Sequence, residues 1–279
     1  MALFKQVTIA GLGLIGGSLG MAMTRHRLAS RVVGLSRSLS TIRRAQQKRA
    51  IDDGTTDPRR AVAEAELVII ATPVGRVIEY GKRLASWMSP GSVLSDVGST
   101  KAEIVHGLRS LPNGVAFMGA HPLAGSEQRG IDAARTDLFD GSICILTPNR
   151  RTDQAALKRV RGLWSALAGR VLTMEPEAHD RLLAAVSHLP HLLAFCLVDA
   201  TEPRARAIAP RSFLDATRVA MSDPDLWDDI FLTNRAALLR AMDRFEQRWR
   251  AARQLLRRGD RASLHRFLRH AQGLRQRLS

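Results

Sequence analysis

The stretch that decides the fold lies near the N-terminus and reads Val7-Thr8-Ile9-Ala10-Gly11-Leu12-Gly13-Leu14-Ile15-Gly16. A short β-type run precedes three glycines at G-x-G-x-x-G spacing, and an apolar helical pattern follows to about Thr24. In this context Gly11 permits a tight turn, Gly13 lets a pyrophosphate approach the backbone, and Gly16 lets the helix pack on the strand. The alternative is a glycine-rich turn without a ligand. We predict a dinucleotide site whose phosphates lie at the helix N-terminus, formed by Gly11, Leu12, Gly13, Leu14, Ile15 and Gly16.

The end of the second expected strand, residues 32–35, indicates which dinucleotide is bound. An acidic residue there would hold the ribose 2′-hydroxyl of NAD, but this chain has Ser36-Arg37-Ser38, followed by Thr41. Hydroxyl groups and a guanidinium suit a 2′-phosphate, which a carboxylate would repel. We therefore predict NADP as the preferred cofactor and NAD as the alternative. The competing interpretation is that Arg37 is only solvated.

Further strand patterns occur at residues 67–71, 92–96, 115–118, 143–146 and 171–172, and helical patterns separate most of them. This alternation is typical of a parallel, doubly wound sheet. After about Met174 only helical patterns remain, at 178–200, 212–221, 224–253 and 261–278. The expected fold class is α/β, a Rossmann-type doubly wound parallel sheet followed by an all-helical C-terminal domain. The expected division is 1–173 for the dinucleotide-binding domain and 174–279 for the helical domain.

Composition sets broad limits on the partners. The 279 residues are 45% hydrophobic and 24% charged, which suits a folded protein, but the net charge is +16. That charge fits a basic surface with no ligand, a small anionic ligand, or nucleic acid. With one Tyr and no aromatic RNA-binding motif, the stacking platform of a single-strand binder is missing, so no nucleic-acid partner is predicted.

The two cysteines, Cys144 and Cys196, lie in apolar runs, and we expect both to be reduced and buried. No metal-ligand spacing occurs, so no metal is predicted. The apolar N-terminus could pass for a signal peptide, but its glycines have cofactor-turn spacing and Arg25-His26-Arg27 follows. No segment is expected to be long enough to span a membrane, and a cytoplasmic enzyme without a membrane partner is predicted.

Three segments after expected strands carry side chains suited to chemistry. Thr72 and Pro73 end the strand at 67–71 and are predicted to contact the cofactor. In Asp96-Val97-Gly98-Ser99-Thr100-Lys101, Thr100 has capping-box spacing to Glu103, which leaves Ser99 to face a ligand. His121 follows a strand and is flanked by glycines and a proline. It is therefore better placed for acid–base work than for packing.

A fourth set of polar residues lies in the first long helical pattern. Asp180, Ser187 and His191 are spaced 7 and 4 residues apart. At about 3.6 residues per turn they would share one helix face. Such a polar stripe indicates the lining of a cleft, and the alternative is a solvated helix edge.

Together these segments resemble the prephenate/arogenate dehydrogenase family of tyrosine biosynthesis. The resemblance runs the length of the chain, and its ordered set of motifs is specific although each motif alone is modest. Its motifs are residues 11–16, 71–73, 96–101, 121–125, 187–191, Asp215-Ala216-Thr217-Arg218, and Ser222 to Ile230.

The resemblance implies an oxidative decarboxylation of a small anionic cyclohexadienyl substrate, which loses hydride to the cofactor and also loses CO₂. His121 would accept a hydrogen bond from the ring hydroxyl and take its proton, while Ser99 would bind the cofactor and hold the nicotinamide, and His121 or the hydroxyl, in register. Arg218 would bind a substrate carboxylate. The C-terminal helices would bind substrate and join two chains in a homodimer, and no separate regulatory domain is expected. The other substrate-binding residues that the resemblance implies are His191, Asp180 and Ser187 in the cleft wall and Glu127 at its mouth.

Several questions stay open at this point. Pro210-Arg211-Ser212-Phe213 replaces a glycine-rich turn usual in the family, so contact of that loop with substrate is in doubt. The choice between prephenate and arogenate is not fixed, although an NADP-type loop tilts it towards arogenate by family association. The competing enzyme class is a β-hydroxyacid dehydrogenase or imine reductase, whose second domain carries a catalytic lysine. No lysine follows Lys158 here. The remaining alternative is a basic protein that senses nucleotides or binds nucleic acid.

Overall fold

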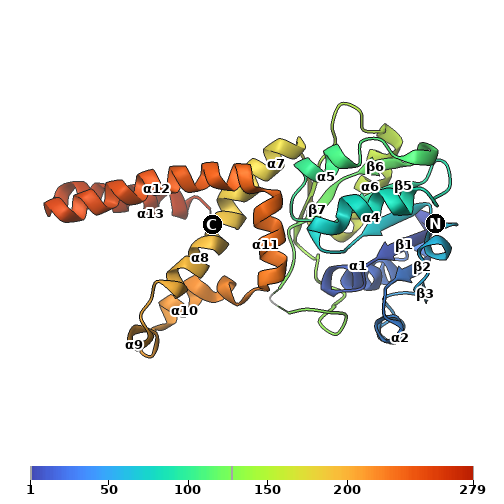
Figure 1. Cartoon of the computed structure of the whole chain (residues 1–279), viewed down its shortest axis with the longest axis horizontal. Helices are drawn as coiled ribbons and strands as arrows, with labels where there is room; N and C mark the ends of the chain where they lie inside the picture. Colours follow the sequence, from blue (N-terminus) through green and yellow to red (C-terminus); the bar gives the residue numbers. More distant parts are fainter. Residues whose placement is uncertain (1, 127, 279) are drawn as a thin grey trace.

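A computed structural model describes residues 2–126 and 128–278. Its N-terminal part is a six-stranded sheet in the order β3-β2-β1-β4-β5-β6, with every neighbouring pair parallel. Helices cover both faces of this sheet (Figure 1). The strand order reverses between β1 and β4, and ligands bind such sheets in the crevice at that reversal, beyond the carboxyl ends of the strands. The strands are β1 (Phe4–Ala10), β2 (Ala29–Leu35), β3 (Asp53–Thr55), β4 (Leu67–Ile70), β5 (Val93–Asp96) and β6 (Ala116–Met118).

This confirms the expected Rossmann-type sheet, and most strand positions agree with the sequence patterns. Strands β1 and β2 begin three residues earlier than expected, because their first residues lie at the sheet's margin, where the apolar pattern is weaker. Strand β3 was not expected, because it is three residues long and contains Gly54. The helices of this part are α1 (Leu14–Arg25), α2 (Leu39–Gln47), α3 (Pro58–Val62), η1 (Val74–Arg76), α4 (Val77–Ala85), α5 (Ala102–Gly107), η2 (Pro112–Gly114) and α6 (Gln154–Leu167).

A second, smaller sheet joins β7 (Ala120–Pro122), β8 (Ile143–Leu146) and β9 (Arg170–Thr173). Strand β7 runs antiparallel to β8, with His121 opposite Ile145, and β8 is parallel to β9. The sequence indicated that His121 follows a strand, whereas in the structure it lies inside one. The chain changes sheets at Gly119, where a Cβ atom would lie 2.6 Å from Oγ1 of Thr147. Only a glycine allows the two sheets to approach so closely there.

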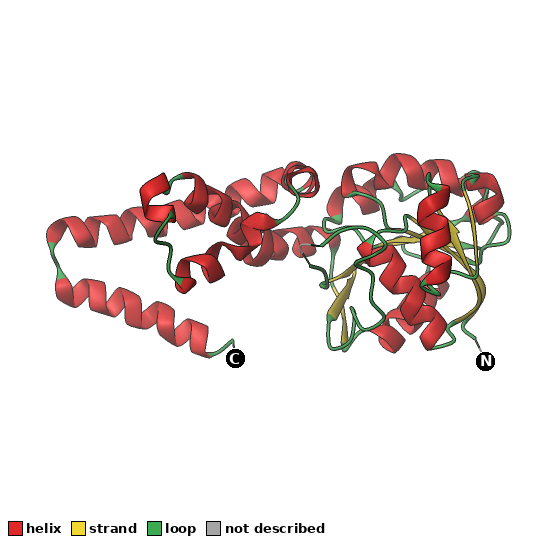
Figure 2. Cartoon of the chain, turned by 90° about the horizontal axis from the view of Figure 1, so that it is seen from below, coloured by secondary structure: helices red, strands yellow, loops and turns green. Residues whose placement is uncertain are grey.

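The C-terminal part is entirely helical, as expected (Figures 1 and 2). The expected helix at 224–253 is in fact two helices, because the chain breaks at Asn234. Helices α12 and α13 form a hairpin that extends away from the sheets, and Gly259 in a left-handed conformation ends α12. The helices are α7 (Pro176–Leu183), a π-helical turn η3 (Ala184–His188), α8 (Leu189–Asp199), α9 (Pro203–Arg206), α10 (Arg211–Thr217), η4 (Arg218–Met221), α11 (Pro224–Thr233), α12 (Arg235–Arg258) and α13 (Arg261–Gln276).

Helices α7, η3 and α8 form one continuous run, Pro176–Asp199, of 24 residues with a mean hydropathy of 1.6. By length and composition alone this run could cross a membrane, so the expectation that no segment is long enough was wrong. Only 22% of its most apolar window is buried within the chain. Both cysteines were expected to be buried. Cys144 in β8 is buried, but Cys196 on α8 is exposed. Both corrections have one cause, since α8 carries apolar side chains on faces that this chain does not cover.

The helical part contacts the sheet part at two places that position the site. Helix α11 packs on η1, where the Asp229 carboxylate accepts a hydrogen bond from the backbone N–H of Gly75 at 3.2 Å. Helix α7 packs on α5, where the Asp180 carboxylate accepts hydrogen bonds from the backbone N–H groups of Lys101 (2.8 Å) and Ala102 (2.9 Å). Both contacts lie at the carboxyl ends of sheet strands, which is where the crevice opens.

Candidate active site

The glycine turn follows β1 and leads into α1. Gly11 has φ +108°, and a Cβ there would lie 2.5 Å from the carbonyl oxygen of Ala71. A Cβ on Gly16 would lie 1.9 Å from the carbonyl oxygen of Gly11. By contrast, a Cβ on Gly13 would meet nothing within 4 Å. Two glycines therefore allow close packing of the turn, and Gly13 borders open space through which a ligand can approach the backbone.

The start of α1 suits an anion. Gly13 is its N-cap, no side chain caps the helix, and no acidic residue lies in the first turn. The helix N-terminus therefore presents backbone N–H groups and the positive end of the helix dipole towards the open space beside Gly13. Beyond β4, the Oγ1 atom of Thr72 is buried and has no hydrogen-bond partner among the described residues. These features fit the diphosphate of a dinucleotide.

The residues predicted to bind the 2′-phosphate lie between β2 and α2. Ser38 is the N-cap of α2, and its Oγ accepts a hydrogen bond from the backbone N–H of Thr41 at 3.3 Å. The Oγ of Ser36 accepts one from the backbone N–H of Ser38, also at 3.3 Å. Arg37 between them is exposed, and Arg44 forms an ion pair with Asp132 at 2.6 Å. The two serines therefore shape a turn that displays the guanidinium of Arg37.

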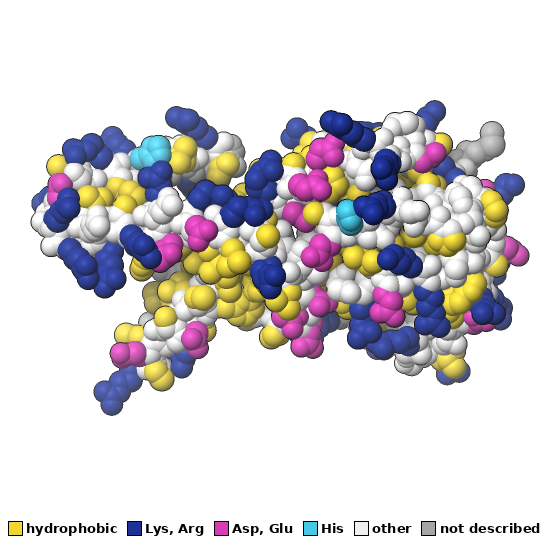
Figure 3. Space-filling view, turned by 45° about the horizontal axis from the view of Figure 1, so that its top comes forward, with side chains coloured by type: hydrophobic (Ala, Val, Ile, Leu, Met, Phe, Trp, Pro, Cys, Tyr) yellow, Lys and Arg dark blue, Asp and Glu magenta, His cyan; other side chains and the backbone are white. Residues whose placement is uncertain are grey.

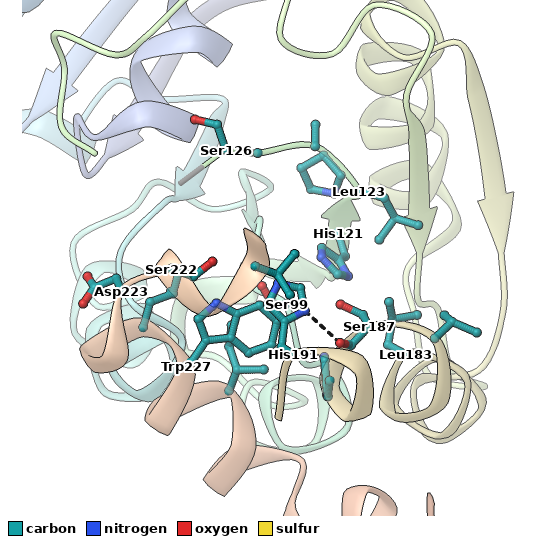
Figure 4. A pocket seen from close by; sticks show the side chains of 18 of the residues that line it. Ser99, His121, Leu123, Ser126, Leu183, Ser187, His191, Ser222, Asp223 and Trp227 are labelled. Carbon is teal, nitrogen blue, oxygen red and sulfur yellow. Dashed lines mark hydrogen bonds between the residues drawn. The ribbon is translucent and has the colours of Figure 1, made fainter. Parts of the chain in front are cut away.

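A cavity of about 500 Å³ lies between the small sheet and the helical part. Side chains from β7, from the α7–α8 run and from α11 converge on it (Figure 4). Five predicted site residues line it, namely Ser99, His121, Ser187, His191 and Arg218. Glu127 lies outside the described residues. The loop at 210–213 contributes no lining residue among the described residues, and its last three residues form the first turn of α10.

The floor of the cavity is aromatic. The imidazole of His191 stacks on the indole of Trp227, with ring centroids 3.6 Å apart and planes inclined by 22°. Nδ1 of His191 lies 2.9 Å from the carbonyl oxygen of Ser187, a contact that fixes the ring (Figure 4). Burial lowers the pKa of His191, and the positive charge of Arg218 contributes in the same direction. Trp227 was not predicted as a site residue, although it lies within a motif of the resemblance.

His121 is 8% exposed, and its Nδ1 lies 2.8 Å from Nε2 of His179. Nδ1 of His179 in turn lies 2.8 Å from Oδ1 of Asp180. Burial holds the pKa of His121 well below its usual range, and the positive charge of Lys101 acts in the same direction. His121 is therefore neutral near pH 7, which is the state that a general base requires.

Asp180 does not line the cavity, although the sequence placed it in the cleft wall. It is 3% exposed and lies behind His179, where it caps the N-terminus of α5. This also replaces the expected capping box. Thr100 does not cap α5, whose N-cap is Lys101, and its Oγ1 instead lies 3.0 Å from Oγ1 of Thr233. Ser99 is nevertheless left facing the cavity, as expected.

A buried ion pair supports the strand that carries His121. The Lys101 ammonium contacts the Asp96 carboxylate, and both side chains are fully buried. Nζ of Lys101 also donates a hydrogen bond to the carbonyl oxygen of Ala120 at 3.0 Å, directly before His121 in β7. The pair therefore ties β5, the start of α5 and β7 together. Because the desolvation of a fully buried ion pair offsets most of its attraction, this pair fixes the geometry of the site more than it stabilises the fold.

The fold and this cavity define a two-part class of Rossmann-fold proteins, in which a helical part closes a site at the edge of the sheet. Residues 19–173 match the family model described as "Prephenate dehydrogenase, nucleotide-binding domain", and residues 175–270 match "Prephenate dehydrogenase, dimerization domain". The chain therefore belongs to the prephenate dehydrogenase family, as the resemblance indicated. The first match begins after the glycine turn.

Individual relatives agree. The chain is 38% identical over 254 residues to a cyclohexadienyl dehydrogenase of Zymomonas mobilis, covering 88% of this chain and 86% of the relative. It is 36% identical over 249 residues to a Bacillus subtilis prephenate dehydrogenase, covering 86% of this chain but only 66% of that longer relative. A crystal structure of Aquifex aeolicus prephenate dehydrogenase with hydroxyphenyl propionate and NAD+ superposes with a TM-score of 0.91 at 32% identity, covering 99% of this chain and 98% of that one.

Proposed function

We propose that the chain catalyses the oxidative decarboxylation of prephenate, arogenate or both, with NADP or NAD as the hydride acceptor. The observation that carries this proposal is that Ser99, His121, His191 and Arg218 line one cavity. The names of the relatives, which include prephenate and cyclohexadienyl dehydrogenases, support the same reaction and do not favour a β-hydroxyacid dehydrogenase or a nucleic-acid-binding protein.

Each side chain then has a role that its surroundings suit. Neutral His121 accepts a hydrogen bond from the ring hydroxyl and takes its proton as hydride leaves the carbon that bears this hydroxyl. Such a base raises the rate by about 10²–10⁴-fold. Ser99 holds that hydroxyl or His121 in register. Arg218 binds a substrate carboxylate, because a guanidinium grips both oxygens. A dinucleotide held at residues 11–16 would supply the hydride acceptor, and loss of hydride and CO₂ from the substrate would leave an aromatic ring.

We further propose that NADP is preferred. This rests on Arg37, which is exposed between two serines beyond β2, and on the lack of an acidic residue at that strand end. The Aquifex aeolicus relative was crystallised with NAD+, so family membership alone does not decide the matter.

A homodimer is the assembly that the helical part supports. The matching family model is named for dimerisation, and the helices after β9 expose large apolar side chains (Figure 3). Such a surface needs a partner in water. These exposed residues include Val186, Leu197, Ile208, Leu214, Met221, Leu232, Leu239, Trp249, Leu256, Leu268 and Leu274. We keep the division at 1–173 and 174–279, a cytoplasmic location, and a chain without membrane or nucleic-acid partners as parts of this proposal.

A turnover assay with both substrates and both cofactors tests the function. His121→Ala is expected to lower kcat by about 10²–10⁴-fold, and Arg218→Ala is expected mainly to raise KM. Near-normal kcat in the histidine variant would overturn the assigned mechanism, and absence of turnover in every combination would overturn the function itself.

A further inference from the structure

Behind the cavity, three side chains from two elements form a continuous hydrogen-bonded row, which neither the family match nor the sequence motifs assign. We propose that His179 is a positioning residue that holds His121 in the tautomer with a proton on Nδ1 and a bare Nε2. His179 lies in α7, is fully buried, and is not among the residues that line the cavity. Its effect on chemistry must therefore pass through His121, with which it shares the 2.8 Å contact.

The direction of each hydrogen bond follows from the far end of the row. Oδ1 of Asp180 accepts from the backbone N–H of Lys101, and Oδ2 accepts from that of Ala102. Because backbone N–H groups can only donate, this carboxyl is an acceptor, and Nδ1 of His179 must carry the proton that it shares with Oδ1.

The remaining assignments follow in sequence. A neutral imidazole has one donor and one acceptor nitrogen, so Nε2 of His179 is an acceptor. Nδ1 of His121 must then donate to it across the 2.8 Å contact. Nε2 of His121 is left without a proton, on a side chain that lines the cavity. This is the atom that a substrate hydroxyl requires as its acceptor.

The same row also stabilises the positive charge that His121 gains when it is protonated. When His121 takes a proton it becomes a cation in a buried site, close to Lys101. Lys101 is already paired with Asp96, so the carboxylate that faces the new charge is Asp180, through His179. Asp180 is fixed by two helix amides and does not need to move when the charge appears. The row therefore prepares the surroundings of His121 for the protonated state.

Free histidine in water favours the opposite tautomer, with the proton on Nε2, so the proposal makes a distinct spectroscopic prediction. We would label histidine with ¹⁵N and record imidazole nitrogen shifts of the full chain without substrate, assigning His121 and His179 by loss of signals in His121→Gln and His179→Gln. Wild-type His121 should show a protonated Nδ1 and an unprotonated Nε2. A protonated Nε2 in wild-type His121 would overturn the proposal.

Two substitutions extend the test to turnover. His179→Leu removes the acceptor, and we expect kcat to fall about 10- to 100-fold, part of what a base contributes, with little change in KM. His179→Gln retains an amide oxygen that can accept from Nδ1, and should recover part of that loss. His106→Gln, the same change at an exposed histidine of α5, should leave kcat unchanged. Equal kcat in the leucine and glutamine variants would point to a structural role and contradict the proposal.

The comparison of kcat values rests on the proposed function, whereas the ¹⁵N measurement of the His121 tautomer does not. If neither substrate is turned over, the proposed function fails and the nitrogen shifts still decide whether His179 positions His121. If His179→Leu does not fold, the wild-type tautomer and the kcat of His179→Gln remain decisive.

Discussion

The side-chain amide nitrogen of Asn234 lies 3.0 Å from Nδ1 of His188 and 2.8 Å from the carbonyl oxygen of Asp180. The carbonyl can only accept, so the amide nitrogen is a donor to both, and neutral His188 carries its proton on Nε2. That Nε2 is buried and has no partner among the described residues, although His188 lines the cavity. His188 therefore presents a neutral N–H group, in contrast to the bare nitrogen assigned to His121.

The stability of the protein should fall in mild acid because of His188. Burial lowers its pKa from 6.5 to about 4. Between those values the unfolded chain binds the proton and the folded chain does not, so the free energy of unfolding falls as pH falls from 6.5 towards 4. At 1.36 kcal/mol per pKa unit, the loss is about 3 kcal/mol by pH 4. Urea unfolding at several pH values should show a shallower dependence in His188→Gln, and parallel curves would contradict this account.

The three glycines of the turn should separate packing from cofactor binding. Gly16→Ala places a Cβ 1.9 Å from a backbone oxygen and should lower the free energy of unfolding by roughly 1–3 kcal/mol. Gly13→Ala meets nothing within 4 Å and lies at φ −87°, so its stability should stay within about 0.5 kcal/mol of wild type. Its new methyl group would nevertheless occupy the approach to the backbone and should weaken cofactor binding about tenfold or more, measured by calorimetry. Unchanged binding would exclude residues 11–16 as the phosphate site.

Arg37 should decide between the two cofactors. A charge-assisted hydrogen bond contributes about 1.5–3 kcal/mol, so Arg37→Ala should lower kcat/KM for NADP about 10- to 100-fold and leave the value for NAD nearly unchanged. Arg43→Ala, at another exposed arginine of α2, is the matched control and should change neither. A wild-type preference for NAD, or an equal loss with both cofactors, would refute the assignment.

The sequence predicted those parts of the site that depend on local order along the chain. The glycine turn, the strand ends and the segments around His121 and His191 each carry their own pattern, and the structure brings Ser99, His121, Ser187 and His191 to one cavity. Asp180 was misplaced because helical periodicity was applied across residues 184–188, which form a π-helical turn. That turn has i→i+5 hydrogen bonds and shifts the faces of the helix.

The supporting residues were missed for a different reason. His179 meets His121 across 58 positions of sequence, and Lys101 meets Asp180 across 79. No pattern within either segment indicates the partner. In the sequence, His179 and Asp180 stand beside Glu177 and Arg181 in a polar segment, and only the structure shows that His179 and Asp180 are buried and therefore require partners.

The exposed apolar surface of the helical part should be an interface between two chains. Trp249, on α12, is 63% exposed, and replacing it with glutamate would place a charge in such an interface. We expect Trp249→Glu to shift the protein towards monomer in size-exclusion chromatography with light scattering. Leu3→Glu, at an apolar residue of the sheet part that is 49% exposed, should leave the assembly unchanged. A wild-type monomer would contradict the proposed homodimer.

The pH profile should reveal how His121 works as a base. The pKa of His121 lies well below the ordinary value of a histidine, chiefly because the side chain is buried. A base must be unprotonated, so kcat/KM should remain level as pH falls from 7.5 to 6.5 and decline only at lower pH, as the folded protein takes up the proton. Buffers spanning pH 4.5–8 with constant ionic strength would show this, provided that the unfolding measurements confirm a folded chain at each pH. Half-maximal kcat/KM at pH 6.5 or above would mean that the titrating base is more exposed to water than His121 is.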